Sequence, residues 1–113
     1  MNRNNTMLTE KDYCDYETRN ELIKLGYPAY LYDNTEVDKI LGAILLYEAQ
    51  KWLREEKQIE ANATYDNIVE LHWHWYMKSL TNRNQIISNT NHDSYEQALL
   101  AGIKETIKIL KEK

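Results

Sequence analysis

Two histidines separated by one tryptophan are the residues in this chain best suited to chemistry. They lie in the segment IVELHWHWYM, residues 68 to 77. In an extended strand, His72, His74 and Tyr76 point to the same face, and the two histidines lie about 6.5–7 Å apart along the chain. Two imidazoles can bind one metal ion, but a catalytic zinc site needs a third protein ligand. The available candidates for a third ligand are Glu70, Tyr76, His92 and Asp93.

Other catalytic chemistry has little support in the sequence. Glu48, Glu70 and His74 contain the groups that acid–base catalysis uses, but nothing in their spacing requires them to meet. The chain has three glycines and no phosphate-binding loop or nucleophile elbow. Its single cysteine, Cys14, excludes an intramolecular disulfide and a multi-cysteine zinc site. We therefore predict a protein that is not an enzyme and holds no cofactor.

The alternation around the histidines predicts a half-buried strand. The odd-numbered side chains are apolar and the even-numbered ones are polar, so one face turns toward a core and the other toward water. We expect Trp73 and Trp75 to point inward. In the opposite register both indoles would be exposed, which would indicate an interface. The inward set is Val69, Leu71, Trp73, Trp75 and Met77.

The N-terminal part is polar and without period, so we predict a flexible segment over residues 1–14 and a single domain over 15–113. Asp15 is suited to cap a short helix from residue 16 to about 25. Leu22, Ile23 and Leu25 supply its apolar face, and Gly26 and Pro28 end it.

An aromatic connection follows, with the sequence YPAYLY over residues 27 to 32. Its proline would restrict it to an edge strand. Tyr30 and Tyr32 are candidate partner-binding residues, because tyrosine combines an apolar ring with a polar tip. The whole chain has nine tyrosines, three tryptophans and no phenylalanine.

A central amphipathic helix is predicted from an N-cap at Thr35 to about Lys57. Gly42 weakens the pattern by about 1 kcal/mol relative to alanine, so two segments with a break near Gly42 remain an alternative. The apolar positions recur at helical spacing: Val37, Ile40, Leu41, Ile44, Leu45, Ala49, Trp52 and Leu53.

Short strands are predicted at residues 59–65, 68–80 and 85–89, with turns at 66–67 and 81–84. Turns this short join antiparallel strands.

The last helix has the clearest start signal, with Asp93 or Ser94 as the cap and Glu96 or Gln97 as its partner. Its apolar or small positions are Tyr95, Ala98, Leu99, Gly102, Ile103, Thr106, Ile107 and Leu110. The predicted fold is α+β: an antiparallel sheet of two to three strands, covered on one face by the central and C-terminal amphipathic helices, with a short N-terminal helix.

The composition of the chain predicts its cellular location and the classes of partner that it can bind. No apolar run approaches the roughly 20 residues of a membrane span, and the N-terminus lacks a secretory signal, so we expect a cytoplasmic protein. The net charge is −4, which argues against nucleic-acid binding. A basic excess at Lys104, Lys108, Lys111 and Lys113 suits the end of a helix, where the macrodipole favours cations.

Three segments carry a resemblance to a known group: YETRNELIKLGY (16–27), LYEAQKWLREEKQIEA (46–61) and DSYEQALLAGIKETIKIL (93–110). They resemble small uncharacterised proteins of gut Bacteroidales phages and prophages, in which a motif like EAQKWLRE accompanies a C-terminal motif like YDSYEEALEAGI. The resemblance covers about three quarters of the chain and does not include His72, Trp73 and His74. It implies a genomic context and a fold, and it carries over no binding or catalytic residue.

Three functions follow as hypotheses. The first is an interaction protein of phage or mobile-element origin that binds a host or phage protein, with an anti-defence inhibitor as one version, or that self-associates. Its contact residues would be His72, His74, Tyr76, Tyr30 and Tyr32. The alternative is a protein that sequesters a small molecule or nucleotide at an oligomer interface. The second alternative is a histidine-based metal-binding protein.

Overall fold

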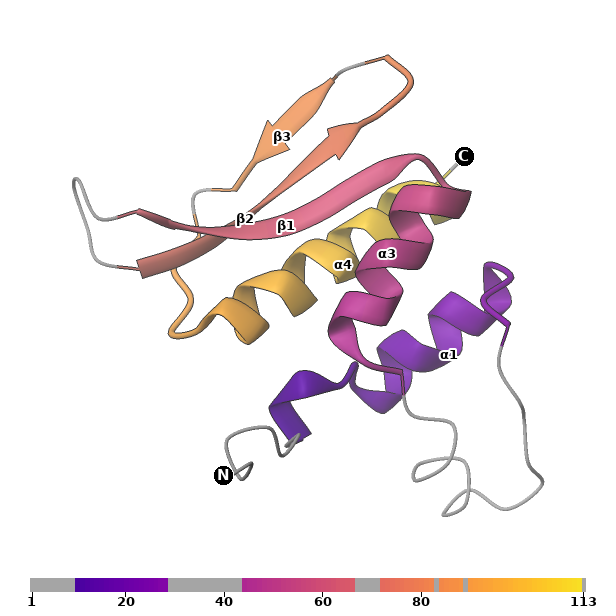
Figure 1. Cartoon of the computed structure of the whole chain (residues 1–113), viewed down its shortest axis with the longest axis horizontal. Coiled ribbons are helices and arrows are strands. Elements are labelled where there is room, and N and C mark those ends of the chain that lie inside the picture. The colour runs from indigo at the N-terminus through magenta and orange to yellow at the C-terminus, as the bar shows by residue number, and fades with distance from the viewer. Residues whose placement is uncertain (1–9, 29–43, 67–71, 83, 89, 113) are drawn as a thin grey trace, which may run out of the picture.

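The computed structural model describes residues 10–28, 44–66, 72–82, 84–88 and 90–112. Their order along the chain is a short 3-10 helix followed by helices and strands: η2 (Glu10–Asp12), α1 (Tyr16–Lys24), α3 (Leu46–Glu56), β1 (Ile59–Asp66), β2 (His72–Ser79), β3 (Gln85–Ile87) and α4 (Tyr95–Lys111). The strands form one antiparallel sheet in the order β1-β2-β3, and Figure 1 shows α4 running along it. The α+β fold is confirmed.

The register of β2 confirms the predicted orientation of its side chains where the structure describes it. Trp75 lies opposite Ala63 and Met77 lies opposite Ala61, and both Trp75 and Met77 are buried. Trp73 is half-buried between two rings, with its centroid 5.1 Å from that of Tyr65 and 5.4 Å from that of Tyr95. The inward face of β2 therefore carries its large apolar side chains.

Helix α4 begins at the predicted signal, and Ser94 is the residue that caps it. The Ser94 side chain accepts a hydrogen bond from the Gln97 N–H, while the Gln97 side chain accepts one from the Asp93 N–H. This reciprocal pair satisfies two backbone donors at the start of the helix. The buried stripe also matches the prediction, with Ala98, Leu99, Gly102, Ile103, Thr106 and Ile107.

Gly102 brings the backbone of α4 close to the sheet. A Cβ atom placed on Gly102 would lie 3.1 Å from the Cβ of Trp75. Because that distance is shorter than an ordinary carbon–carbon contact, a side chain here would push the helix away from β2. The small residue sets the spacing of the two layers.

Helix α3 is shorter at its start than the sequence predicts. It begins at Leu46, so Ile44 and Leu45, which the apolar spacing places on the helical face, are not helical. Leu45 has extended backbone angles, and its N–H donates to the Glu48 side chain, which fixes the helix start at this point. The end matches the prediction, because Lys57 is the C-cap. The predicted cap at Thr35 and the break near Gly42 lie outside the described residues.

Helix α1 confirms its predicted start and end. The Asp15 side chain accepts a hydrogen bond from the Thr18 N–H, and Gly26 has a φ of 111°, which an L side chain rarely adopts. The buried residues of α1 differ from the predicted apolar face: Leu22 is buried, but so are Thr18 and Arg19.

The segment before α1 contacts the rest of the chain. The Cys14 N–H donates to the carbonyl oxygen of Ile44 at 2.8 Å, and Tyr13 forms a bridge with Leu45. The packed part of the chain thus begins before residue 15. In the aromatic connection, Tyr27 packs edge-on against Trp52 with centroids 5.4 Å apart, while Tyr30 and Tyr32 lie outside the described residues.

We predict that Gly102→Val lowers the free energy of unfolding by about 2 kcal/mol or more, because the added side chain overlaps Trp75. Urea denaturation measures the effect. Lys108→Val is the control, since Lys108 is exposed on the same helix, and it should change stability by about 0.5 kcal/mol or less. Equal losses in both variants would show that β-branching in the helix, and not the close approach, is responsible.

Candidate functional site

The predicted contact residues of β2 lie together on the side of the sheet opposite α4. We call this surface the open face and define it by His72, His74, Tyr76, Thr64 and Ile87. Side chains directly opposite in a sheet share a face, and the register pairs His74 with Thr64 and Tyr76 with Ile87. The structure thus places three of the five predicted residues side by side.

The two imidazoles of the open face are neighbours. Their ring centroids are 5.8 Å apart with an angle of 50° between the planes, and both rings are half-buried. The remaining predicted residues, Tyr30 and Tyr32, lie outside the described residues.

His92 does not join these two histidines. Its backbone pairs with Trp73, so its side chain belongs to the face of Trp73, opposite to that of His72 and His74. The His92 ring instead makes a 2.8 Å hydrogen bond with Thr90. Across the part of the chain that the structure describes, no three His, Cys, Asp or Glu side chains converge as a metal site would need.

Cys14 and Glu48 both contribute to the structure: Cys14 packs in the core, and Glu48 caps the start of α3. Cys14 is buried, and burial, together with the nearby charge of Asp15, raises the pKa of its thiol to about 12. At neutral pH it is therefore a thiol and a poor nucleophile. The Glu48 side chain accepts a hydrogen bond from the Leu45 N–H at the start of α3.

The outer edge of β1 is covered by side chains. Gln50 of α3 donates to the carbonyl oxygen of Ala61 at 2.8 Å. The Asn62 side chain accepts from the Ala63 N–H and also from the hydroxyl of Tyr95, at 2.8 and 3.3 Å. Burial raises the pKa of that tyrosine above its usual value. An added strand would have to displace these groups, so this edge is closed.

The outer edge of β3 is different. Among the described strands β3 is the last of the sheet, and Figure 1 shows it on the side away from α1. Ile86 and Ile87 are 48% and 62% exposed, and Leu80 at the preceding turn is 42% exposed. Consecutive residues of a strand face opposite sides, so two adjacent isoleucines in an edge strand cannot both reach the core. Two adjacent isoleucines in a predicted edge strand are therefore the sequence signal for this exposed apolar edge.

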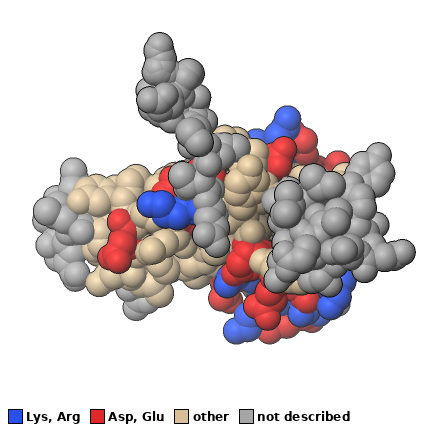
Figure 2. All heavy atoms as spheres, turned by 90° about the horizontal axis from the view of Figure 1, so that it is seen from below, with Lys and Arg blue, Asp and Glu red and all other residues tan. Residues whose placement is uncertain are grey.

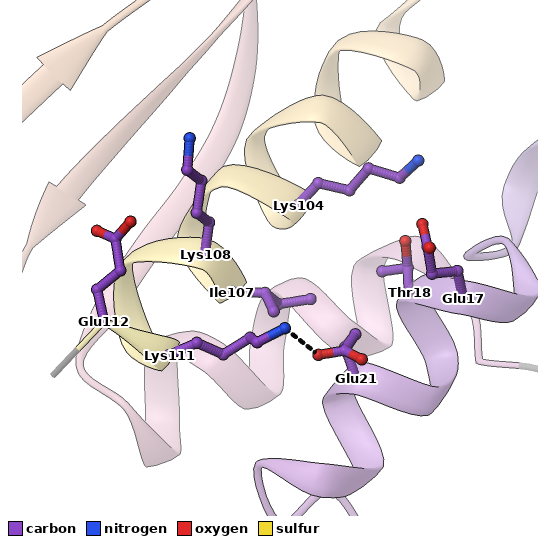
Figure 3. Close-up of a pocket in the computed structure, with 8 residues that line it drawn as sticks. All are labelled: Glu17, Thr18, Glu21, Lys104, Ile107, Lys108, Lys111 and Glu112. Carbon is purple, nitrogen blue, oxygen red and sulfur yellow. Dashed lines mark ion pairs between the residues drawn. The ribbon is translucent and has the colours of Figure 1, made fainter.

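A cleft of about 560 Å³ lies between α1 and α4, a feature that residue spacing does not predict. In Figure 3, Lys111 reaches across to Glu21, while Lys108 points away from α1. The lining residues are Glu17, Thr18, Glu21, Lys104, Ile107, Lys108, Lys111 and Glu112.

Two ion pairs tie α1 to α4 beside this cleft. Lys104 lies 2.7 Å from Asp15, and Lys111 lies 2.7 Å from Glu21. The lysines therefore contact carboxylates of α1 in addition to lying toward the end of α4. Because the cleft has as many carboxylates as lysines, it offers little net charge to a ligand.

The same contacts shift the titration of the carboxylates. Partial burial alone would raise the pKa of Asp15, but hydrogen bonds from Lys104 and Thr18 hold this pKa below its usual value. Hydrogen bonds from Lys111 and Lys24 lower the pKa of Glu21.

The charged side chains of the face seen in Figure 2 do not form a patch of one sign. Lysines and arginines lie among aspartates and glutamates there, and part of the same surface is uncharged. This face shows no continuous basic strip among its described residues.

Comparison of the chain with family models, with curated proteins and with solved structures gave no match. No relative therefore assigns a role to any residue of this chain. Within the described ranges no helix is long and apolar enough to cross a membrane.

We predict that Asp15→Asn lowers the melting temperature at pH 7 by less than about 5 °C, since asparagine keeps the cap but loses the ion pair, which is exposed. The pKa of Asp15 is lower in the folded state, so the pair contributes above pH 4 and is lost as the pH falls. The difference in melting temperature between wild type and variant should therefore shrink steadily as the pH falls below about 4.

Thermal melts between pH 7 and pH 3 measure this difference. Asp93→Asn serves as the control, because Asp93 is exposed and has no ion pair among the described residues. A difference between wild type and Asp15→Asn that stays constant over this pH range would contradict the assignment.

Proposed function

We propose that this protein is a small interaction module without catalytic activity, encoded by a phage or mobile element, and that its open face binds another protein. One observation carries the proposal. The sheet has helices against one face only, among the described elements, and the opposite face presents imidazole, phenol and aliphatic side chains next to an unprotected edge strand.

The chemistry of the open face favours a protein partner. Tyr76 and Ile87 are adjacent across β2 and β3, and His74 lies two residues along the strand from Tyr76. Aromatic rings beside aliphatic side chains are enriched at the centres of protein interfaces, whereas charged residues are depleted there. Lys78 is the described charged residue of β2, and it lies at the end of this surface.

The charge of the chain supports a protein over a nucleic acid. The net charge is −4, and the lysines beside the α1–α4 cleft are largely engaged with carboxylates. A nucleic-acid binder needs cations free to neutralise phosphates. An acidic protein can instead occupy a basic surface, so a basic, nucleic-acid-handling host defence protein is one specific partner class within the proposal.

Sequestration of a small ligand by His72, His74 and Tyr76 has less support. The cleft of about 560 Å³ lies between α1 and α4, whereas these three side chains belong to the face of the sheet that is turned away from α4. Ligand capture at the open face would depend on a second subunit to enclose it.

A photo-reactive phenylalanine analogue at position 76 tests the proposal. Added to lysate of the natural host, this variant should cross-link to a discrete protein, because position 76 lies at the centre of the open face. Excess unmodified protein should compete, and excess His74→Ala, Tyr76→Ala double variant should not. Competition is read as loss of the cross-linked band.

The matched control carries the same analogue at position 47. Tyr47 is 54% exposed on α3, outside the open face. Equal cross-linking from both positions, or none from position 76, would count against the open face as a binding surface.

A further inference from the structure

The hydrogen-bonding direction of β3 can be followed residue by residue. The Asn84 carbonyl accepts from the Ser79 N–H and the Ser88 N–H donates to the Trp75 carbonyl, so both groups point toward β2. Because this direction alternates along a strand, the N–H and C=O groups of Gln85 and Ile87 point away from the sheet. The outer edge therefore presents two donors and two acceptors in strand geometry.

Within the part of the chain that the structure describes, this edge lacks the devices that usually protect an edge strand. Proteins block such edges with charged side chains, proline, bulges or a covering element. Residues 84 to 88 read NQIIS and contain none of these residue types. At the opposite edge, by contrast, Gln50 and Asn62 occupy the outward backbone groups of β1.

We propose that a second copy of this chain pairs with β3, in an antiparallel arrangement with a two-fold axis at Ile86. The inference rests on the proposed function, and it names a second copy as the partner that binds at the β3 edge, beside the open face. Ile86 of each copy would face Ile86 of the other, and Gln85 would face Ile87. The outward groups of Gln85 and Ile87 would then form four hydrogen bonds between the copies, joining two three-stranded sheets into one.

The edge is self-complementary in shape and polarity. Ile86 lies opposite Met77 and so belongs to the face that α4 covers, while Gln85 and Ile87 belong to the open face. Across the axis, the two Ile86 side chains would meet on one face, and each Ile87 would meet a Gln85 on the other. The 48% and 62% exposure of the two isoleucines would be reduced on both faces at once.

Charge also favours a second copy at this position. Two chains of net charge −4 repel each other, so self-contact is most favourable where neither copy presents a charge. The β3 edge meets that condition, because its three residues are neutral. The nearest described charge of the sheet is Lys78, which lies one strand back, opposite Gln85. Across the pairing, the two Lys78 residues would lie at least three strand spacings apart, about 14 Å, which exceeds the screening length at physiological salt.

The expected association is weak and concentration-dependent. Three paired residues bury less area than a standard interface, so we expect a dissociation constant on the order of 100 μM. Sedimentation velocity of the wild-type protein between about 10 μM and 1 mM should show a monomer that converts to a dimer.

Cysteine cross-linking tests the register. In the proposed pairing, the Cα atoms of the two Ile86 residues lie about 4.5 Å apart, within disulfide range. Under mild oxidation at 100 μM, on the order of the expected dissociation constant, Ile86→Cys should form disulfide dimers at least about tenfold faster than the control Tyr47→Cys. Both sites are exposed, and the native Cys14 is buried and contributes little background. Non-reducing gels measure the rates.

Two results would overturn the proposal: a wild-type protein that stays monomeric at 1 mM, or Ile86→Cys cross-linking no faster than Tyr47→Cys. If these occur while position 76 still cross-links to another protein, the proposed function stands and only the second copy is excluded. If the dimer forms but position 76 captures nothing, the second copy is supported and binding of a different protein is excluded.

Discussion

The close contact between α4 and the sheet is the constraint on which the other features depend. Gly102 brings the helix backbone against Trp75, and the stripe around it buries Leu99 and Ile103 completely or nearly so. Full burial of a large apolar side chain contributes roughly 1.5–3 kcal/mol, so this layer supplies much of the favourable burial. It also determines which face of the sheet is covered, because β2 can turn its apolar side chains to one side only.

The face of the sheet that α4 covers determines which side chains are left on the opposite face. With Trp75 and Met77 directed at α4, the even-numbered residues of β2 must face the other way, and His72 and His74 become neighbours there. Helix α3 then closes the β1 edge through Gln50, which leaves β3 as the open edge among the described strands. The open face, with His74, Tyr76 and Ile87, is therefore a consequence of how the core is filled. Its function remains our proposal.

The N-terminal helix is held in a different way. Its apolar face is small, with Leu22 as its fully buried apolar side chain, and ion pairs from Asp15 and Glu21 to lysines of α4 add to the attachment. Exposed ion pairs contribute little individually. The backbone bond from Cys14 to Ile44 and the bridge from Tyr13 to Leu45 connect the segment before α1 to the start of α3. The attachment of α1 therefore combines a modest core with several polar contacts.

The sequence by itself determined the features that depend on near neighbours. The caps at Asp15 and Ser94, the buried stripe of α4 and the orientation of Trp75 arise from bonds and periods within a few residues, so a local pattern predicts them. Only the tertiary structure decided where α3 begins, that the His92 side chain lies on the far face from His74, that Gln50 closes the β1 edge, and that an α1–α4 cleft forms. Each of these depends on groups that meet only after the chain has folded, or on competition between a local helix and a longer-range contact, and residue spacing carries no information about such encounters.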